Sequence, residues 1–467
     1  KDEDVEKGLT IFAIDGIEQG DDVEYYIMMK KYSSNFGRVF YQFSYPMLKA
    51  SFEIISPDNL LYDIKGYNGF EEIKKDKLSN ERNHYLAEME NIPSIKDEKF
   101  SYVTPRKARI DYRLDYNTSG SPAQILTWDD AAQQIYSIIY QDVNPKHISK
   151  WMKSIEIDKK GTLLEKAAQV EEYLKKNVYL QEDYVPGFYD LLFVYKNKVT
   201  NSRGMVRLYA NIFDNLGIDH TVILTSERND VKFDKDFQSW NFLGEYLIYL
   251  PKEDKYIDPS DFSLRIGYAN GELTATDGLF MERVKIGDYE SAIAKIKYIE
   301  PLPYDMNYHN MKIDISVDAD KSEATVISTV GFKGLSGGYF GRIYEMMDEE
   351  SKEDLLSQLS TINAPVSEFT KLEVISECDV DYMKDAGFIT YSEITTPTFI
   401  EVAGNKLILK VGETIGQQVE MYFEEDRKSI IENDFNRKYY RVITVKVPEG
   451  YKISNPEVGN MNFVENI

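Results

Sequence analysis

The stretch VTNSRGMVRLYANIFDNLGI, residues 199–218, decides how the middle of this chain folds. Its apolar residues recur at helical spacing, which predicts an amphipathic helix from about Arg203 to Asn215. Gly217 follows, and glycine is the residue that most often ends a helix in the left-handed conformation. The residues before Arg203 are polar and small, so we expect them to form the loop that leads into the helix.

The segments after this helix have the composition of strands. HTVILTS (220–226) is rich in β-branched residues, which favours a buried strand. EYLIYLP (245–251) and KYIDPS (255–260) predict a hairpin that ends at Asp258, directly before a proline. The order is therefore a loop, a helix, a strand and a hairpin.

The bulk composition limits the class of protein. A length of 467 residues predicts two to four domains, and 35 tyrosines are typical of β-rich architecture. No apolar run is long enough for a transmembrane segment. The formal net charge of −24 disfavours nucleic acid as a partner, because an acidic surface repels phosphate groups. The acidic residues are dispersed, so we attribute them to solubility.

Residues 1–112 predict an N-terminal β-sandwich, since apolar runs alternate with turn signals. The expected strands include VEYYIMMKKY (23–32), RVFYQFSYP (38–46) and KASFEIISP (49–57). Residues 71–83 are too charged for the interior of a strand, and we expect an exposed excursion there.

Residues 113–158 change to helical spacing and predict a helical connector. Thr127 begins a capping pattern for the first helix, and Asn144 precedes a proline that starts the second. We expect Trp128 and Trp151 to be core anchors rather than ligand platforms.

Residues 159–288 form the α+β core, whose first helix begins with a capping box of Thr162 and Glu165. Residues 296–467 return to strand patterns and predict a C-terminal antiparallel β-sandwich with a helical insertion at 348–362. We expect this last domain to be incomplete in the present chain.

The pattern from 199 to 260 resembles the core of transglutaminase-like cysteine peptidases and acyl-transferases, a papain-like fold. In that family a Cys begins the helix, a His lies in the next long strand, and an Asp precedes a Pro. Counting back from Leu216-Gly217-Ile218 puts Ser202 at the Cys position. Counting back from Pro251 and Asp258 puts Glu245 at the His position, so only Asp258 matches the triad.

The order of the domains extends the resemblance to nearly the whole chain. A group of bacterial envelope proteins, common in Bacteroidetes, places a transglutaminase-like core between two domains of unknown function. GIEQGDDVEYYIMMKKYSS (16–34) and SYPMLKASFEIISPDN (44–59) resemble the first of those domains. The resemblance implies a secreted protein with a periplasmic or cell-surface location, although the chain starts at Lys1 without a signal peptide.

The residues at the triad positions predict a pseudoenzyme. The family chemistry needs a thiolate activated by an imidazole. A serine hydroxyl is barely ionised at neutral pH, and the carboxyl group of Glu245 needs strong burial to act as a base there. We therefore interpret Ser202 as a helix N-cap and expect no catalytic residue at Ser202, Glu245 or Asp258.

No other residue of the sequence supplies a site with better support. Cys378, the single cysteine, lies on an expected strand, where we interpret it as a small buried residue. His220 is expected to be a structural strand residue, and no histidine spacing indicates a zinc site. Residues 334–338 (GLSGG) are expected to form a turn, so we predict neither a metal nor a cofactor. A glycosidase carboxylate pair stays open, because 79 acidic residues do not single one out.

Three functions follow as hypotheses. The first is a non-catalytic protein that binds a peptide, glycan or protein partner in the degenerate cleft, where Tyr189, Trp240 and Tyr246 could provide contact area. The second is an active peptidase or acyl-transferase with a rearranged site. The third is a structural or adhesive envelope module.

Overall fold

The structure is a computed structural model that describes most of the chain. The described residues are 4–6, 9–11, 16–30, 35–70, 72–183, 185–360, 362, 364, 366–376, 387–417 and 426–460. Internal contacts divide the chain into two units, Lys1–Asn35 and Phe36–Ile467. Cys378 lies outside the described residues.

The first unit contains one small hairpin, in which β1 (Asp4–Glu6) pairs antiparallel with β2 (Leu9–Ile11). The strand predicted over 23–32 is wrong for its described part, since residues 21–30 have neither helix nor strand. The side chains of Tyr26 and Met28 are exposed. A strand needs a pairing partner as well as the right composition, and these residues pair with no described strand.

The second unit begins with two three-stranded antiparallel sheets that share one apolar core. The first sheet has the order β3 (Phe36–Phe40), β8 (Arg109–Asn117) and β5 (Leu60–Tyr67). The second has the order β4 (Met47–Ser56), β7 (Asn83–Ile92) and β6 (Ile73–Lys77).

The charged stretch 71–83 is not simply an excursion from these sheets. It contributes β6, an edge strand whose side chains are mostly exposed. Charged residues are common on such edges because they discourage pairing with another chain. The sheet also extends past residue 112, since β8 continues to Asn117.

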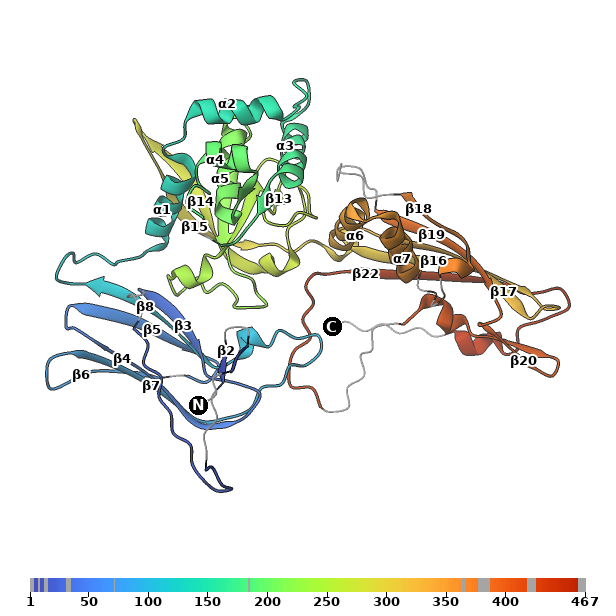
Figure 1. The fold of residues 1–467 in the computed structure, drawn as a ribbon, viewed down its shortest axis with the longest axis horizontal. Coiled ribbons are helices and arrows are strands. Elements are labelled where there is room, and N and C mark those ends of the chain that lie inside the picture. The colour runs from blue at the N-terminus through green and yellow to red at the C-terminus, as the bar shows by residue number, and fades with distance from the viewer. Residues whose placement is uncertain are drawn as a thin grey trace. The chain divides into compact units, whose positions relative to one another are not determined.

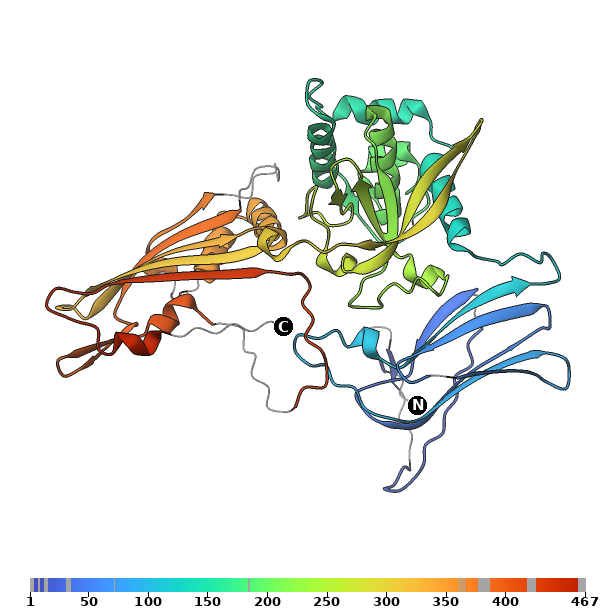
Figure 2. The ribbon, with the colours of Figure 1, turned by 180° about the vertical axis from the view of Figure 1, so that it is seen from behind.

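The core of the chain is a five-stranded antiparallel sheet with helices gathered on one side (Figures 1 and 2). The strand order is β13 (Lys255–Ile257), β12 (Glu245–Leu250), β11 (Thr221–Thr225), β14 (Thr276–Ile286) and β15 (Tyr289–Ile299). The helices are α1 (Trp128–Tyr140), α2 (Pro145–Ser154), α3 (Leu163–Asn177), α4 (Leu191–Asn197) and α5 (Ser202–Leu216). Two short strands, β9 (Tyr179–Leu180) and β10 (Val199–Thr200), pair in parallel beside them.

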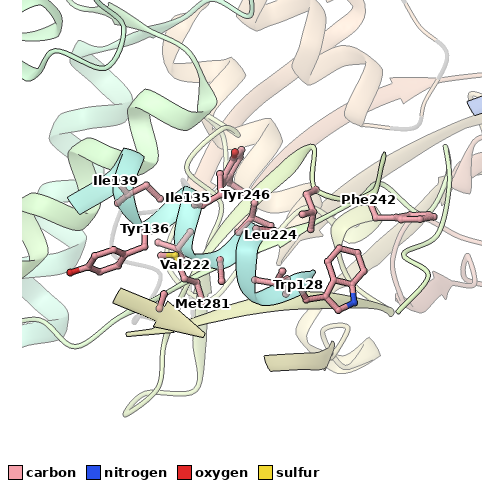
Figure 3. Packing of buried hydrophobic residues seen from close by; sticks show 14 of the residues in the cluster. Trp128, Ile135, Tyr136, Ile139, Val222, Leu224, Phe242, Tyr246 and Met281 are labelled. Atoms are coloured by element: carbon pink, nitrogen blue, oxygen red, sulfur yellow. The ribbon is translucent and has the colours of Figure 1, made fainter. Parts of the chain in front are cut away.

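Helix α5 lies at the centre of this arrangement because it is apolar on two sides. Val206 and Ala210 join a cluster with α1 and the sheet, part of which Figure 3 shows. Leu208 and Ile212 join a second cluster with α2, α3 and α4. The segment expected to be a connector therefore packs as part of the core.

The two tryptophans singled out in the sequence are buried in these clusters, as predicted. Trp128 belongs to the first cluster and Trp151 to the second. The capping boxes expected at Thr127 and Thr162 are also present.

The C-terminal region is a mixed sheet covered by helices, so the prediction of an antiparallel β-sandwich is wrong. Its strand order is β18 (Phe369–Ser376), β19 (Phe388–Thr396), β17 (Glu323–Phe332), β16 (Tyr308–Asp318) and β22 (Lys438–Lys446). Strand β22 runs parallel to β16. Helices α6 (Leu335–Met346) and α7 (Glu349–Leu359) pack on one face (Figure 1), and a hairpin of β20 (Ile400–Ala403) and β21 (Lys406–Leu409) follows.

The turn predicted at the glycine-rich stretch 334–338 is also wrong. Gly334 has a φ of 74° and precedes the first residue of α6, so the expected turn is the start of a helix. The helical insertion expected at 348–362 is confirmed as α7.

Seven short 3-10 turns complete the described structure. They are η1 (Thr104–Arg106), η2 (Trp240–Phe242), η3 (Gly271–Leu273), η4 (Tyr304–Met306), η5 (Val366–Glu368), η6 (Val411–Ile415) and η7 (Pro456–Gly459). The chain is thus a mixed α+β protein with mainly antiparallel sheets. Among the described helices, none has the length and apolar character that a membrane crossing requires.

Candidate functional site

The first turn of α5 carries Ser202, the residue at the predicted nucleophile position. Asn201, not Ser202, is the N-cap, since its side chain accepts a hydrogen bond of 3.0 Å from the Gly204 amide. The expectation that Ser202 caps the helix is therefore wrong. As the first helical residue, Ser202 turns its hydroxyl outward and donates it to Oε1 of Glu182 at 2.8 Å.

Gly204, in the first turn of α5, allows the start of this helix to pack closely against the preceding residues. A side chain at this position would collide with the Thr200 hydroxyl and the Phe188 carbonyl oxygen. The Thr200 hydroxyl also donates to that carbonyl at 2.9 Å, which ties β10 to the loop before α4. The tip of α5 is thus packed closely against the residues that precede it.

Glu245, at the predicted histidine position, is the first residue of β12 and pairs with Thr225 of β11. Burial raises the pKa of its carboxyl group to about 7, and the negative charges of Glu227, Asp258 and Glu182 add to the effect. Three carboxyl groups are therefore close enough to raise the pKa of Glu245, and one of them, Glu182, also contacts Ser202.

Asp258 directly follows β13 and is only 2% exposed. Its Oδ1 accepts hydrogen bonds from the amides of Ser260 at 3.0 Å and Asp261 at 3.1 Å, and its Oδ2 accepts one from Asn270 at 3.3 Å. Burial raises its pKa to about 6, although Lys175 opposes the shift. In this arrangement Asp258 organises a loop through backbone amides.

None of the four histidines lies at this site. His220 is a buried structural residue, as predicted, held by the Tyr140 hydroxyl at 3.0 Å and the Ile218 carbonyl oxygen at 2.9 Å. His84 contacts Asp76 and Glu53, whereas His147 contacts Asp190 and His309 contacts Arg441. No group of metal-ligating side chains gathers in the part of the chain that the structure describes.

The three aromatic binding candidates occupy different environments. Tyr246 is 3% exposed, and its ring belongs to the cluster shown in Figure 3. Its hydroxyl accepts a hydrogen bond of 2.7 Å from Nε of Arg203, which also interacts with the Tyr189 hydroxyl. Tyr189 and Trp240 are half-buried, so these two offer more surface to a ligand than Tyr246 does.

Three residues of the site were missed in the sequence. Arg203 follows Ser202 directly, and this adjacency was the only available signal. Glu182 and Glu227 lie in loops without periodicity, and no motif connects either residue to α5. Their proximity depends on the packing of the whole core.

The ionisation of Glu245 gives a first prediction. We expect Glu245→Gln to increase the free energy of unfolding at pH 8 by about 1–2 kcal/mol, after allowing for partial solvent access. Because the folded pKa is raised, the contribution of Glu245 to stability is lost as pH rises from the ordinary Glu range through about 7. Glutamine cannot ionise, so the advantage of the variant should grow between pH 5 and pH 8 in urea unfolding. Glu156→Gln, at an exposed position, should show no such trend.

Comparisons with known proteins give little further information. No family model matches the chain, and no curated protein matches it. One solved structure is similar, that of a protein from Parabacteroides distasonis described provisionally as a protease. It is 11% identical, with a TM-score of 0.43, and the match covers 77% of this chain and 70% of the other.

Proposed function

We propose that this chain is a non-catalytic, transglutaminase-like protein of the bacterial envelope that binds a peptide beside the tip of α5. The proposal is carried by one observation: the hydroxyl at the nucleophile position contacts a carboxylate, and every histidine has its contacts elsewhere. The order of helix, strand and hairpin from Ser202 to Asp258 supports the relation to the family.

The chemistry of the site supports binding rather than acyl transfer. A serine nucleophile needs a base that removes its proton and holds a positive charge in the transition state. Glu245 and Asp258 have raised pKa values because they are buried and close to other carboxyl groups. Two such carboxyl groups cannot together replace an imidazole, since ionising one opposes ionising the other.

The same carboxyl groups favour a cationic ligand. Glu182 contacts the Ser202 hydroxyl, and Glu182 and Glu227 are close enough to Glu245 to raise the pKa of its carboxyl group. A Lys or Arg side chain of a peptide would relieve the mutual repulsion and could lie against Tyr189 and Trp240. We therefore propose a basic peptide as the ligand class.

The proposal makes a two-part prediction. The purified chain should transfer no acyl group between glutamine-donor and amine-acceptor substrates and should hydrolyse no peptide, and Ser202→Ala should not change these results. Fluorescently labelled basic peptides should bind, while acidic peptides and neutral glycans should not. Glu245→Gln should weaken basic-peptide binding about tenfold, the effect of losing one charge-assisted contact. Turnover that disappears in Ser202→Ala would overturn the proposal.

The 2.8 Å contact between Ser202 and Glu182 favours one alternative, an active hydrolase in which this carboxylate is the base. Glu182 is exposed, which keeps it hydrated and weakens it as a base. For this alternative, Ser202→Ala and Glu182→Gln should both abolish a measurable turnover. If neither variant changes the background rate, the alternative fails.

A further inference from the structure

A second cavity, separate from the tip of α5, lies between α3, β9, the loop after Asp258, and α6. It encloses about 730 Å³, a volume that suits a small organic molecule. Its apolar lining comes from three segments of the core and from α6: Val178, Leu180, Met205, Pro259, Phe262 and Met346. Ser202, Glu245 and the aromatic candidates do not line it.

The polar lining of this cavity is mostly cationic, although the chain as a whole carries a net charge of −24. The cations are Lys175, Lys176, Lys198, Arg265 and Arg342, and the lining contains one carboxylate, Glu345. The cavity is therefore a local region of positive charge that favours an anion, within a chain whose net charge opposes one.

Two carboxylates behind the lining hold most of these cations in place. Glu171 pairs with Lys175 at 2.9 Å. Glu172 is shared by Lys176 at 2.7 Å and by Arg265 and Arg342 at 2.8 Å each. Arg342 also pairs with Glu345 at 2.7 Å. Five cations therefore share three carboxylates, and the positive charge at the cavity is only partly neutralised.

Lys198 differs from the other cations because it has no carboxylate partner among the described residues. Its ammonium group lies over three aromatic rings, 4.3 Å from the centroid of Trp151, 4.6 Å from that of Tyr195, and 5.7 Å from that of Tyr173. Its backbone is left-handed, with a φ of 56° at the C-cap of α4, a conformation that lysine seldom adopts. The three rings therefore hold the Lys198 side chain in position, and its positive charge is not neutralised by a carboxylate and can pair with an anionic ligand.

We propose that this cavity binds a small amphipathic carboxylate, with its charged group at Lys198 and its apolar body against Met205, Phe262 and Met346. Lys198 supplies the charge, and the apolar lining selects against small inorganic anions. An aliphatic and an aromatic acid share this chemistry.

The test is isothermal titration calorimetry of the full chain with decanoate and, in a second arm, 4-phenylbutyrate. At least one of the two acids should bind. The acid that binds shows whether the apolar part of the ligand is aliphatic or aromatic. For the aliphatic arm, 1-decanol should bind at least tenfold more weakly than decanoate and decylammonium should not bind. For the aromatic arm, 4-phenylbutanol and 4-phenylbutylammonium serve the same purpose.

The variants separate the charge of Lys198 from its structural role. Lys198→Gln should weaken acid binding about tenfold, whereas Lys198→Arg should stay within about threefold of the parent chain. Lys196→Gln is the matched control, since it removes the same charge from an exposed position of the same helix and should change nothing. Phe262→Ser, at a side chain that is 47% exposed, should weaken the acid without unfolding the chain.

Each variant is first checked for an unchanged melting temperature. The proposal fails if neither acid binds, or if the acid and its alcohol bind equally. It also fails if Lys198→Gln, folded as the parent chain is, binds the acid with unchanged affinity.

Discussion

Replacing Glu171 with alanine should lower the free energy of unfolding of the core by about 3–5 kcal/mol, because it leaves a buried charge without its partner. Glu171 and Lys175 have side-chain exposures of 0% and 1%. Lys175 donates to Glu171 at 2.9 Å and to the Leu264 carbonyl oxygen at 2.7 Å. The second oxygen of Glu171 accepts the Ile266 amide at 2.7 Å. The variant therefore loses an ion pair and a backbone contact together.

The experiment can follow tryptophan fluorescence during unfolding in guanidinium chloride. All three tryptophans of the chain, Trp128, Trp151 and Trp240, lie in the core region, so the signal reports on that region. Glu282→Ala is the control. The ion pair of Glu282 with Lys297 is 2.8 Å long, close to the 2.9 Å of the Glu171–Lys175 pair, but both of its side chains are exposed. Glu282→Ala should cost less than about 1 kcal/mol.

A double variant identifies the cause of the loss. Glu171→Met combined with Lys175→Met removes both charges and keeps similar volume, so it should recover much of the stability lost in the single variant. If Glu171→Ala costs no more than Glu282→Ala, the pair is not buried in solution. If the double variant is no better than the single one, the loss comes from packing instead of charge.

The buried Glu171–Lys175 ion pair shows what the sequence could and could not predict about the fold. The capping box at Thr162 and the helical spacing predicted α3 correctly. The i,i+4 spacing of Glu171 and Lys175 is consistent with pairing, but the same spacing is common on solvated helix faces. Their burial depends on Leu264 and Ile266, about 90 residues further along, and local patterns carry no information on such contacts.

The strand predictions failed for a related reason. Composition favours extended backbone at residues 23–32, but pairing decides whether a strand forms, and pairing is not local. The glycine-rich start of α6 was assigned to a turn because glycine is a poor helix former in isolation. There the helix is stabilised by packing, with Phe340 and Tyr344 against the strands of the C-terminal sheet.

The candidate site shows the same division between local and distant information. Ser202, Glu245 and Asp258 were located by counting along a pattern of helix and strands. The structure places Glu245 within electrostatic reach of Asp258 and Glu182, and Glu182 in contact with Ser202. Arg203 bridges Tyr246 and Tyr189, an arrangement that no spacing rule describes.

Replacing Trp151 with alanine should also lower the free energy of unfolding by about 3–5 kcal/mol, because it removes a fully buried ring and leaves a cavity that its neighbours fill only in part. Trp151 is 0% exposed and has edge-on contacts with the rings of Tyr195 and Tyr173. Its indole N–H donates to the Leu191 carbonyl oxygen at 3.0 Å, which joins α2 to the start of α4. The residue thus contributes both apolar area and a buried hydrogen bond.

Trp151→Phe separates these two contributions. Phenylalanine keeps most of the apolar contact but removes the indole donor to the Leu191 carbonyl oxygen, which should cost about 0.5–1.5 kcal/mol. Trp240→Ala, at a half-buried ring in the same region, should cost less than Trp151→Ala when melting is followed by circular dichroism. If the phenylalanine and alanine variants are equally unstable, the hydrogen bond dominates and the argument from packing fails. If Trp240→Ala is the more damaging change, Trp151 does not anchor the second cluster, and α2 packs on α5 by other contacts.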